Sequence, residues 1–512
     1  MLSKIYSSAT FGINAYIVEV ETNVEKQIPS FTIVGLPDNA VKESRERVTT
    51  AIKNNGLEFP KRKITVNLAP ADVKKEGTSF DLPIAVGLLS ATSVIKEFET
   101  EKIIFLGELA LDGKLRPVKG ALPISVEAKR REIKRIILPA ESAVEASIVD
   151  GIEVFGMENL SEVIQFLNGE INKERIVTDI SKLFGKINQY HIDFSDVKGQ
   201  ENVKRALEVA AAGAHNILMI GPPGSGKTML AKRLPTILPP LTFDEALETT
   251  KIHSVAGILP KDQALVTERP FRSPHHTVSD AALVGGGSFP RPGEVSYAHY
   301  GVLFLDELPE FKKNVLEVLR QPLEDGKVTV SRSKLSVEFP ANFMLAAAMN
   351  PCPCGYYTDP AKECTCAPPQ IQKYMARISG PLLDRIDIHI EVPAVKYKEL
   401  SSEATGETSV SIRERVIKAR EIQLQRFKGL KNIFNNGDMG SREIRQFCRL
   451  DSAGSELMKM AMTKLGFSAR AYDRILKVSR TIADLENSEN ILPQHISEAI
   501  QYRSLDRELW KH

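Results

Sequence analysis

The first part of the chain alternates short β-like runs of apolar residues with longer stretches whose apolar residues recur at helical spacing. A period of two predicts half-buried strands, and a period near 3.6 predicts amphipathic helices. Strands are expected at 15–20, 63–68 and 135–138, and helices at 39–54 and 82–94. This mixture predicts a compact α/β domain over residues 1–167.

The pattern changes twice beyond this domain. Residues 168–193 carry mixed charge and weak periodicity, which is typical of a linker. Residues 194–395 hold apolar strands followed by polar or glycine-rich loops, and after Pro393 the pattern becomes wholly helical. We therefore predict an α/β core over 194–395 and a helical lid over 396–512. The lid helices are expected at 409–427, 441–448, 455–465, 469–485 and 493–502.

A glycine loop joins a predicted strand to a predicted helix. The apolar run Asn216–Ile220 precedes the loop, and the helix-like run Met229–Leu234 follows it. In this context the backbone N–H groups of the loop and the helix N-terminus face phosphates. Lys227 is expected to neutralise the β and γ oxygens, and Thr228 to offer its hydroxyl to Mg²⁺. The nucleotide-binding residues predicted here are Gly221, Pro222, Pro223, Gly224, Ser225, Gly226, Lys227 and Thr228.

A second apolar strand, Val302–Leu305, ends in two acids. The carboxyl end of a strand is where an open α/β sheet presents ligands. Asp306 is expected to hold the Mg²⁺ shell, and Glu307 to polarise the attacking water. Taken alone, the run is interpreted more simply as a core strand that enters a loop. Paired with the glycine loop, it predicts ATP binding and hydrolysis.

Length and charge restrict the function classes. A chain of 512 residues suits about three domains. Lys and Arg number 67 and Asp and Glu number 65, so any surface that binds nucleic acid must be local. No apolar run approaches about eighteen residues, and the first residues lack the apolar core of a signal peptide. We expect a cytoplasmic protein without a membrane partner.

Several strings outside the two phosphate motifs are not general ATPase features. They are Asp196–Gln200, Arg272–Thr277, Val284–Gly287, Pro292–Glu294 and Asn350–Gly355. With the phosphate motifs, they resemble the magnesium-chelatase-like AAA+ ATPases of the ComM/YifB family over nearly the whole chain. The resemblance implies a P-loop AAA+ three-layer α/β core with a C-terminal helical lid. It also implies ATP and Mg²⁺ as ligands and a homo-oligomeric, hexameric ring.

The resemblance assigns roles to further residues. In AAA+ rings, an Asn at the position of Asn350 orients the attacking water. An Arg at the position of Arg385 reaches the γ-phosphate held by the neighbouring subunit, and Arg470 occupies the lid-sensor position. The backbone around Val197 and Gly199 is implied to lie near the adenine. The implied catalytic set is Glu307, Asn350, Arg385 and Arg470.

Residues 327–337 alternate like a hairpin whose tip is Ser331–Lys334. In chelatase and replicative-helicase relatives, a hairpin here points into the central pore. Repeated around a ring, Arg332 and Lys334 would form a basic collar. Such a collar binds the phosphates of branched or single-stranded DNA without reading bases. An ordinary solvated hairpin tip is the alternative.

Two groups of residues are candidate metal ligands. The first group is Cys352, Cys354, Cys364 and Cys366. Four thiolates can close a tetrahedral Zn²⁺ site, although the C-x-C spacing is tighter than the common C-x₂-C, and free thiols in a turn-rich loop are the alternative. The second group is His275 and His276, in the family insertion between Ser254 and His299. Because no third ligand at helical spacing accompanies them, we interpret this pair as structural or substrate-facing.

Three segments of the first domain resemble the Lon-type protease fold, which is ribosomal S5 domain 2-like. They are Lys75–Pro83, Gly107–Gly120 and Arg135–Pro139. Ser79 falls where that family keeps its nucleophile, but Leu122 stands where its lysine base is expected, and Lys119 is three residues away. We interpret the domain as a fold relative without peptidase chemistry, which binds DNA or organises the ring. The basic run 129–135 suits phosphate contact or a solvated helix face.

Three functions follow from these patterns and resemblances. The first is an ATP-dependent DNA motor, a ring that promotes branch migration or unwinding of intermediates in recombination or natural transformation. The second is the motor subunit of a magnesium-chelatase-type metal insertion complex, which normally lacks the Lon-like domain and the cysteine loop. The third is an ATP-dependent Lon-like protease, which Leu122 disfavours.

Overall fold

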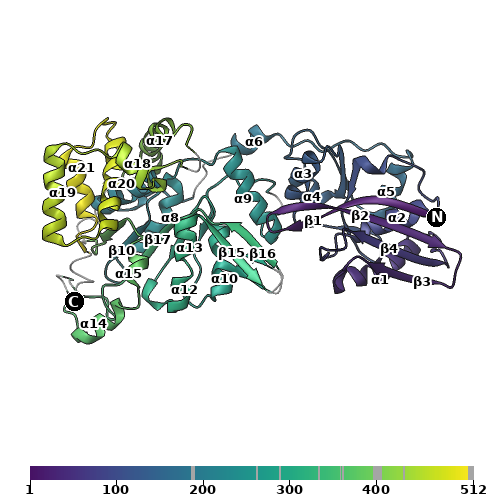
Figure 1. Cartoon of the computed structure of the whole chain (residues 1–512), viewed down its shortest axis with the longest axis horizontal. Helices are drawn as coiled ribbons and strands as arrows, with labels where there is room; N and C mark the ends of the chain where they lie inside the picture. Colours follow the sequence, from purple (N-terminus) through teal and green to yellow (C-terminus); the bar gives the residue numbers. More distant parts are fainter. Residues whose placement is uncertain are drawn as a thin grey trace. The chain divides into compact units, whose positions relative to one another are not determined.

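The computed structural model describes residues 1–185, 191–260, 263–287, 290–332, 335–357, 359, 362–395, 406–430 and 433–505. The chain forms two compact units (Figure 1). The first consists of Met1–Lys186 with Phe243–Thr267, and the second of Ile187–Thr242 with Glu268–His512. Residues 243–267 thus belong to the first unit, although the sequence places them in the predicted core.

The first unit is built on a seven-stranded sheet with the order β3-β4-β2-β1-β5-β8-β9. Strands β1, β2 and β4 pair antiparallel, whereas the outer pairs β3–β4, β1–β5, β5–β8 and β8–β9 are parallel. The strands are β1 (Leu2–Phe11), β2 (Asn14–Glu25), β3 (Ser30–Val34), β4 (Lys63–Ala69), β5 (Ile103–Phe105), β8 (Arg135–Pro139) and β9 (Glu153–Met157), with β6 (Glu108–Leu109) and β7 (Leu115–Arg116) as a separate pair.

Helices of the first unit pack against this sheet and against one another. They are α1 (Asn39–Asn54), α2 (Asp81–Ala91), α3 (Ala121–Arg130), α4 (Ala140–Ala146), α5 (Leu160–Leu167), α6 (Ile180–Gly185) and α9 (Phe243–Ala256). Helix α2 is apolar on nearly every side and is buried against β1 and β2. Its one acid, Asp81, is held by Arg47, whose Nε donates to Oδ2 at 2.6 Å.

Two segments in the first unit differ from the sequence-based expectation. Part of the predicted linker is structured, because Ile176 forms an antiparallel bridge with Val154 of β9 and α6 follows. Helix α9 packs against α3, and the Ser254 hydroxyl donates to the partly buried Glu145 carboxylate. Apolar periodicity does not reveal either feature, since each is formed by contacts with residues far away in the chain.

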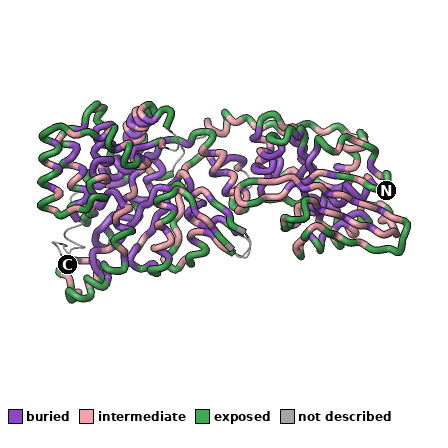
Figure 2. The backbone as a smooth tube through the Cα atoms, viewed as in Figure 1, coloured by how far each residue is buried: buried purple, intermediate pink, exposed green. Residues whose placement is uncertain are grey.

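The second unit contains a five-stranded sheet in which all pairs are parallel, with the order β11-β14-β17-β10-β18. The strands are β11 (Phe271–Arg272), β14 (Val302–Leu305), β17 (Met344–Met349), β10 (Ile217–Ile220) and β18 (Ile388–Glu391). Figure 2 colours the central strands purple, and β10, β14 and β17 are buried along their whole length. Because the strands are parallel, their carboxyl ends meet at one edge of the sheet.

Helices and two hairpins complete this core. The helices are α7 (Glu201–Gly213), α8 (Lys227–Ile237), α10 (Asp280–Val284), α11 (Glu294–Tyr297), α12 (Lys313–Glu317), α13 (Arg320–Asp325), α14 (Pro368–Met375) and α15 (Gly380–Leu383), and the short 3₁₀ turns include η2 (Phe194–Asp196) and η3 (Leu308–Glu310). The hairpins are β12 (Gly285–Gly286) with β13 (Arg291–Pro292), and β15 (Lys327–Arg332) with β16 (Leu335–Pro340).

The C-terminal region is helical, as its pattern predicts. Its helices are α17 (Ser409–Arg426), α18 (Ser441–Phe447), α19 (Ser452–Leu465), α20 (Ala469–Leu485) and α21 (Pro493–Gln501). Helices α17 and α20 pack against α7 and share one apolar core with the five-stranded sheet. The predicted α/β class and helical C-terminus are confirmed. Within the described residues, no helix combines the length and apolarity needed to cross a membrane.

Candidate functional site

The loop between β10 and α8 holds the glycines of the predicted phosphate site. Gly224 and Gly226 have φ angles of 78° and 90°, a left-handed conformation that glycine adopts readily. A Cβ on Gly221 would lie 2.1 Å from the carbonyl oxygen of Val392, closer than real Cβ contacts come. The path of the loop therefore depends on its glycines. The predicted strand–loop–helix arrangement is confirmed.

Lys227 is the first residue of α8 and is buried beneath this loop. Its Nζ donates to the carbonyl oxygens of Gly221 and Pro222 at 2.7 and 2.9 Å. Burial lowers the pKa of Lys227 to about 8, and the nearby Asp306 offsets only part of this effect. An ammonium group with this environment favours an incoming anion, because phosphate oxygens would supply the charge that stabilises it.

Thr228 and Asp306 meet across the sheet edge. The Thr228 hydroxyl donates to Oδ2 of Asp306 at 2.6 Å, although the two residues come from α8 and from the end of β14. A hydroxyl and a carboxylate are oxygen donors, which are the ligands that Mg²⁺ prefers. The pair therefore fits the Mg²⁺ that the sequence motifs predict.

Glu307 follows Asp306 in an uncommon backbone conformation. Its φ is 52°, in the left-handed region that is costly for a residue with a Cβ. Its side chain is 57% exposed, and Oε2 lies 3.5 Å from Nδ1 of His276. The left-handed turn separates the two acids, so Asp306 faces Thr228 while Glu307 faces His276.

Asn350 lies directly after β17, the strand between β14 and β10. Its Oδ1 is 3.2 Å from Nζ of Lys227. Three neighbouring strands thus bring the predicted Lys227, Thr228, Asp306 and Asn350 together at one edge. This edge can bind a phosphate chain and a divalent cation and present a polar amide and a carboxylate to water.

Gln200 is a residue of this site that sequence reasoning missed. Its Nε2 donates to the carbonyl oxygens of Ser225 in the phosphate loop and of Pro393, at 2.9 and 2.7 Å. It follows Val197, which is buried, and Gly199, whose φ is 65°. The predicted adenine segment is thereby tied to the phosphate loop. Its position in the Asp196–Gln200 string was the available signal.

The two predicted arginines lie in a different part of the second unit. Arg385 forms an ion pair with Glu324 and donates to the Pro381 carbonyl at 2.7 Å. Arg470, at the start of α20, donates to Asp384 at 3.1 Å. The role predicted for Arg385 concerns a neighbouring subunit, and it stays a prediction.

The predicted hairpin is present as β15 and β16, whose register runs from Lys327 opposite Pro340 to Arg332 opposite Leu335. Lys334 and the side chain of Arg332 lie outside the described residues. At the base of the hairpin, Lys327 pairs with Glu338 at 2.9 Å. The predicted contact of the tip with DNA stays a prediction.

The four clustered cysteines bring their sulfur atoms within 4.8 Å of one another. The Sγ atom of Cys352 lies 3.3 Å from that of Cys354 and 3.7 Å from that of Cys364. A tetrahedron of Zn–S bonds requires sulfur separations of about 3.8 Å. Backbone N–H groups of Gly355 and Tyr357 donate to the Cys352 sulfur at 3.2 and 3.3 Å, which stabilises a thiolate. The donor set fits Zn²⁺.

This cysteine loop also touches the phosphate loop. Gly355 has a φ of 87°, and a Cβ added there would lie 2.5 Å from Cδ of Pro223. The cysteine loop begins just after Asn350, so a metal bound by the cysteines would also fix the position of the end of β17.

Comparisons with known proteins agree with this geometry. Models described as "Subunit ChlI of Mg-chelatase", "Magnesium chelatase, subunit ChlI" and "Magnesium chelatase, subunit ChlI C-terminal" match residues 20–142, 193–400 and 406–503. Competence protein ComM of Haemophilus influenzae is 45% identical over 100% of this chain and 99% of its own length. The chain belongs to the magnesium-chelatase-like ComM/YifB family.

Other relatives place the chain within this family. The uncharacterized protein YifB of Salmonella typhimurium is 45% identical over 99% of this chain and 98% of its own length. The magnesium-chelatase 38 kDa subunit of Rhodobacter capsulatus is 28% identical over only 31% of this chain and 50% of its own length. Membership of this AAA+ family implies ATP and Mg²⁺ as ligands.

In the N-terminal unit, Leu122 stands at the position where a Lon-type protease is expected to have its lysine base. Leu122 is buried, and its backbone N–H donates to Glu145 at 2.8 Å. Burial raises the pKa of Glu145, and the bonds from Ser254 and Leu122 offset only part of the effect. Lys119 is exposed and its side chain lies against Gly257. These contacts favour the interpretation without peptidase chemistry.

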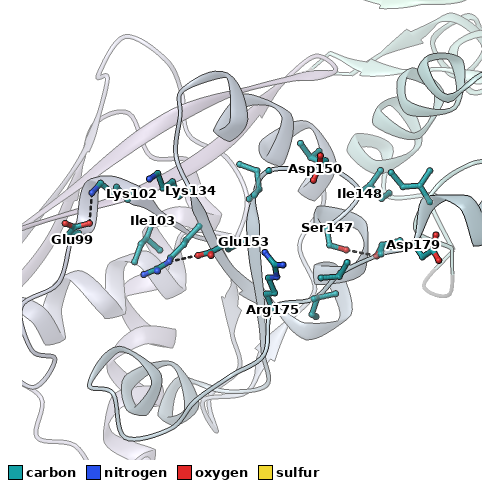
Figure 3. A pocket seen from close by; sticks show the side chains of 18 of the residues that line it. Glu99, Lys102, Ile103, Lys134, Ser147, Ile148, Asp150, Glu153, Arg175 and Asp179 are labelled. Carbon is teal, nitrogen blue, oxygen red and sulfur yellow. Dashed lines mark hydrogen bonds and ion pairs between the residues drawn. The ribbon is translucent and has the colours of Figure 1, made fainter.

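The N-terminal unit also contains an open cavity of about 1030 Å³ (Figure 3). Its lining carries charged side chains of both signs, and two ion pairs form among them: Lys102 with Glu99 at 2.7 Å and Arg135 with Glu153 at 2.8 Å. In the basic run 129–135, Arg130 and Arg131 pair with Glu127. A surface of mixed charge does not favour the binding of a polyanion such as DNA. These ion pairs therefore support the interpretation of residues 129–135 as a solvated helix face.

Proposed function

We propose that this protein is an ATP-dependent DNA motor, a homo-oligomeric and most simply hexameric ring that promotes branch migration or unwinding of recombination intermediates. The single observation that carries the motor is the meeting of Lys227, Thr228, Asp306 and Asn350 at the edge of the five-stranded sheet. The DNA substrate is supported by the full-length similarity to a relative named as a competence protein.

In this mechanism, each group at the sheet edge has one task. Lys227 neutralises the phosphates, and Thr228 and Asp306 would hold Mg²⁺. When bound there, the ion would supply positive charge beside the phosphates. Asn350 positions the attacking water, and Glu307 accepts its proton. Arg385 would act on the nucleotide of a neighbouring subunit.

We further propose that Cys352, Cys354, Cys364 and Cys366 hold one structural Zn²⁺. The sulfur separations and the N–H donors to sulfur support the site. Gly355 of the cysteine loop packs against Pro223 of the phosphate loop. A metal that fixes the cysteine loop would therefore also stabilise the conformation of the phosphate loop. Four thiolates close the coordination shell, so the role is structural rather than catalytic.

Chelatase motor function has weaker support. The magnesium-chelatase subunit resembles only 31% of this chain, whereas the competence protein resembles all of it. A metal-insertion motor would hydrolyse ATP without responding to DNA. The two candidates therefore differ in one measurable property.

The test is a steady-state ATPase assay without DNA and with linear double-stranded, single-stranded and four-way-junction DNA. We expect DNA to stimulate hydrolysis and junctions to stimulate it most, with junction displacement in parallel. The Glu307→Gln variant is the matched control, because it keeps the binding residues but lacks the proton acceptor. Hydrolysis that ignores every DNA form would contradict the DNA motor and favour the chelatase-type alternative.

A further inference from the structure

Helix α14 is a short helix that begins close to the cysteine cluster. It runs from Pro368 to Met375, and its first residue comes two positions after Cys366. Its first turn is exposed, whereas Tyr374 and Met375 at its other end are buried. An isolated helix of eight residues is not stable in water. The position of α14 therefore depends on the contacts that hold its two ends.

The cysteine cluster holds the first end. The sulfur of Cys366 accepts a hydrogen bond from the backbone N–H of Cys354 at 3.3 Å. Ala367, which lies between Cys366 and the helix, donates its backbone N–H to Oε1 of Gln370 at 3.0 Å, and this bond satisfies a donor at the helix start. The proposed zinc ligand Cys366 thus also anchors the start of α14.

The other end of α14 reaches the residue that is expected to orient the attacking water. Tyr374 is 6% exposed, and its hydroxyl is hydrogen-bonded to the backbone of Asn350. Burial and the nearby charge of Glu310 raise the pKa of Tyr374, so the hydroxyl stays neutral. The Asn350 side chain lies with Oδ1 3.2 Å from Nζ of Lys227. A bond to the Asn350 backbone therefore helps to fix where its amide points.

Arg377 follows α14 by two residues and holds the turn after Glu307. Its Nη1 donates to the carbonyl oxygen of Pro309 at 3.1 Å and to Oε2 of Glu310 at 2.8 Å. Its Cζ lies 6.0 Å from the centre of the Tyr374 ring, so the two side chains support each other. Because both members of the ion pair are nearly half exposed, the bond to the Pro309 carbonyl matters more than the ion pair.

Glu307 needs such support because of its backbone conformation. A φ of 52° is costly for a residue with a Cβ and persists only where the surrounding structure fixes it. The Glu307 carbonyl accepts a hydrogen bond from the N–H of Glu310 at 2.8 Å, which closes the turn. Arg377 binds two groups of this same turn. Loss of Arg377 would let the turn relax and change the direction of the Glu307 side chain.

We propose that α14 links the cysteine cluster to the hydrolytic side of the ATP site, with Tyr374 positioning Asn350 and Arg377 positioning the turn that carries Glu307. The inference rests on ATP hydrolysis by the proposed motor. Both side chains act on the groups that handle the water. Their loss should therefore slow hydrolysis far more than it weakens ATP binding.

The experiment measures kcat and KM for ATP, the affinity for a non-hydrolysable ATP analogue and thermal unfolding in full-length variants. Tyr374→Phe removes only the hydroxyl, and we expect kcat to fall about fivefold, as for the loss of one ordinary hydrogen bond. Arg377→Ala should lower kcat about tenfold, because its bonds are charge-assisted. Arg377→Lys keeps a cationic donor and should recover part of that loss. The analogue affinity should stay within about twofold of wild type. Lys373→Ala is the control, because Lys373 is exposed on the same helix.

Mixed assemblies separate this role from an action on the neighbouring subunit. Arg377→Ala and Glu307→Gln both damage the subunit's own site, so mixing these two variants should restore no activity. Arg385→Ala mixed with Glu307→Gln is the positive control, because Arg385 is predicted to act on the neighbour's nucleotide. Zinc content should stay at the wild-type level in Tyr374→Phe and Arg377→Ala, which separates their effect from damage to the cysteine cluster.

Folded Tyr374→Phe and Arg377→Ala variants with the wild-type kcat overturn the inference. A fall in analogue affinity as large as the fall in kcat shows a general structural role and overturns it as well. Restored activity in the Arg377→Ala mixture would place that arginine in the neighbour's site, with the same consequence. ATP hydrolysis that ignores every DNA form contradicts the DNA motor but leaves the inference intact, because α14 acts on hydrolysis. A wild type that hydrolyses no more ATP than Glu307→Gln removes both.

Discussion

Arg470 donates a hydrogen bond from Nη1 to Oδ2 of Asp384 at 3.1 Å, which joins the first turn of α20 to the residue before Arg385. One helical turn later, Arg474 pairs with Asp387 at 2.9 Å. Residues four apart lie on the same face of a helix. Helix α20 therefore holds both sides of the turn that carries Arg385.

Asp387 also connects the Arg385 turn to β10, the strand that leads into the phosphate loop. His215, two residues before β10, lies with Nδ1 3.2 Å from Asp387 and Nε2 2.7 Å from Thr481 of α20. Burial alone would raise the pKa of Asp387, but Arg474 and His215 outweigh it and hold the pKa well below its usual range. The carboxylate thus stays charged, and its contacts tie α20, the Arg385 turn and the start of β10 together.

Arg385→Ala should bind ATP almost normally but hydrolyse it about a thousandfold more slowly, because it removes positive charge from the neighbour's transition state. Mixing this variant with Glu307→Gln should restore part of the activity at interfaces where one intact site meets one intact arginine. Steady-state ATPase of the mixtures measures this. A wild-type rate in Arg385→Ala alone would move the assignment to Arg377, which pairs with Glu310 at 2.8 Å.

Lys227→Ala and Glu307→Gln should separate binding from hydrolysis. Loss of the Lys227 ammonium removes charge-assisted bonds to phosphate and should weaken ATP binding by about 10- to 100-fold. Glu307→Gln should bind as wild type and assemble, yet turn over no ATP. Titration with a fluorescent ATP analogue and an ATPase assay report the two properties. Equal ATP affinity in wild type and Lys227→Ala would remove the lysine from the phosphate site.

When ATP binds, the amino group of Lys227 should take up a proton. The pKa of the free site is about 8, lowered by burial, and phosphate raises it in the complex. The complex then holds more protons than the free protein between the two pKa values, so affinity should fall as pH rises through about 8 and upward. Calorimetry at about pH 8.5 in two buffers of different ionisation enthalpy measures the uptake. Below about pH 7 the lysine is already charged, and this uptake should vanish.

The cysteine site should contain about one zinc per chain in carefully reduced protein. Cys354→Ser should lower the metal content and reduce the melting temperature by about 5 °C or more. ATP affinity should fall as well, because Gly355 packs against Pro223. Cys448→Ser is the control, since that cysteine is buried outside the cluster. Metal-free wild type of undiminished stability would reduce the cluster to free thiols.

Replacing Arg332 and Lys334 together by Ala should weaken DNA binding and uncouple ATP hydrolysis from strand movement. Each lost phosphate contact should lower the slope of log affinity against log salt by about 0.7 to 0.9. Basal ATPase and assembly should persist. Lys327→Ala is the control, because that lysine pairs with Glu338 at the base of the hairpin. Unchanged junction displacement by the double variant would shift the search for the DNA contact to the N-terminal domain.

Much of the fold could be predicted because its signals are local. Helices α1 and α20 begin and end where periodicity places them, at Asn39–Asn54 and Ala469–Leu485. The domain boundaries are harder, since α9 comes from the predicted core but packs on α3. Its docking rests on packing against α3 and on a bond between Ser254 and Glu145, and helical periodicity is the same whichever domain a helix covers.

The sequence alone determined the phosphate loop and the clustering of the cysteines. Both depend on residues close together in the chain, where glycine conformation and ligand spacing act directly. The tertiary structure decided which distant side chains meet: Gln200 with the phosphate loop, Arg470 with Asp384, and His276 with Glu307. These contacts follow from strand order and helix packing. Apolar periodicity predicts that a strand is buried but not which strand lies beside it, so the partner of Glu307 emerged only from the folded sheet.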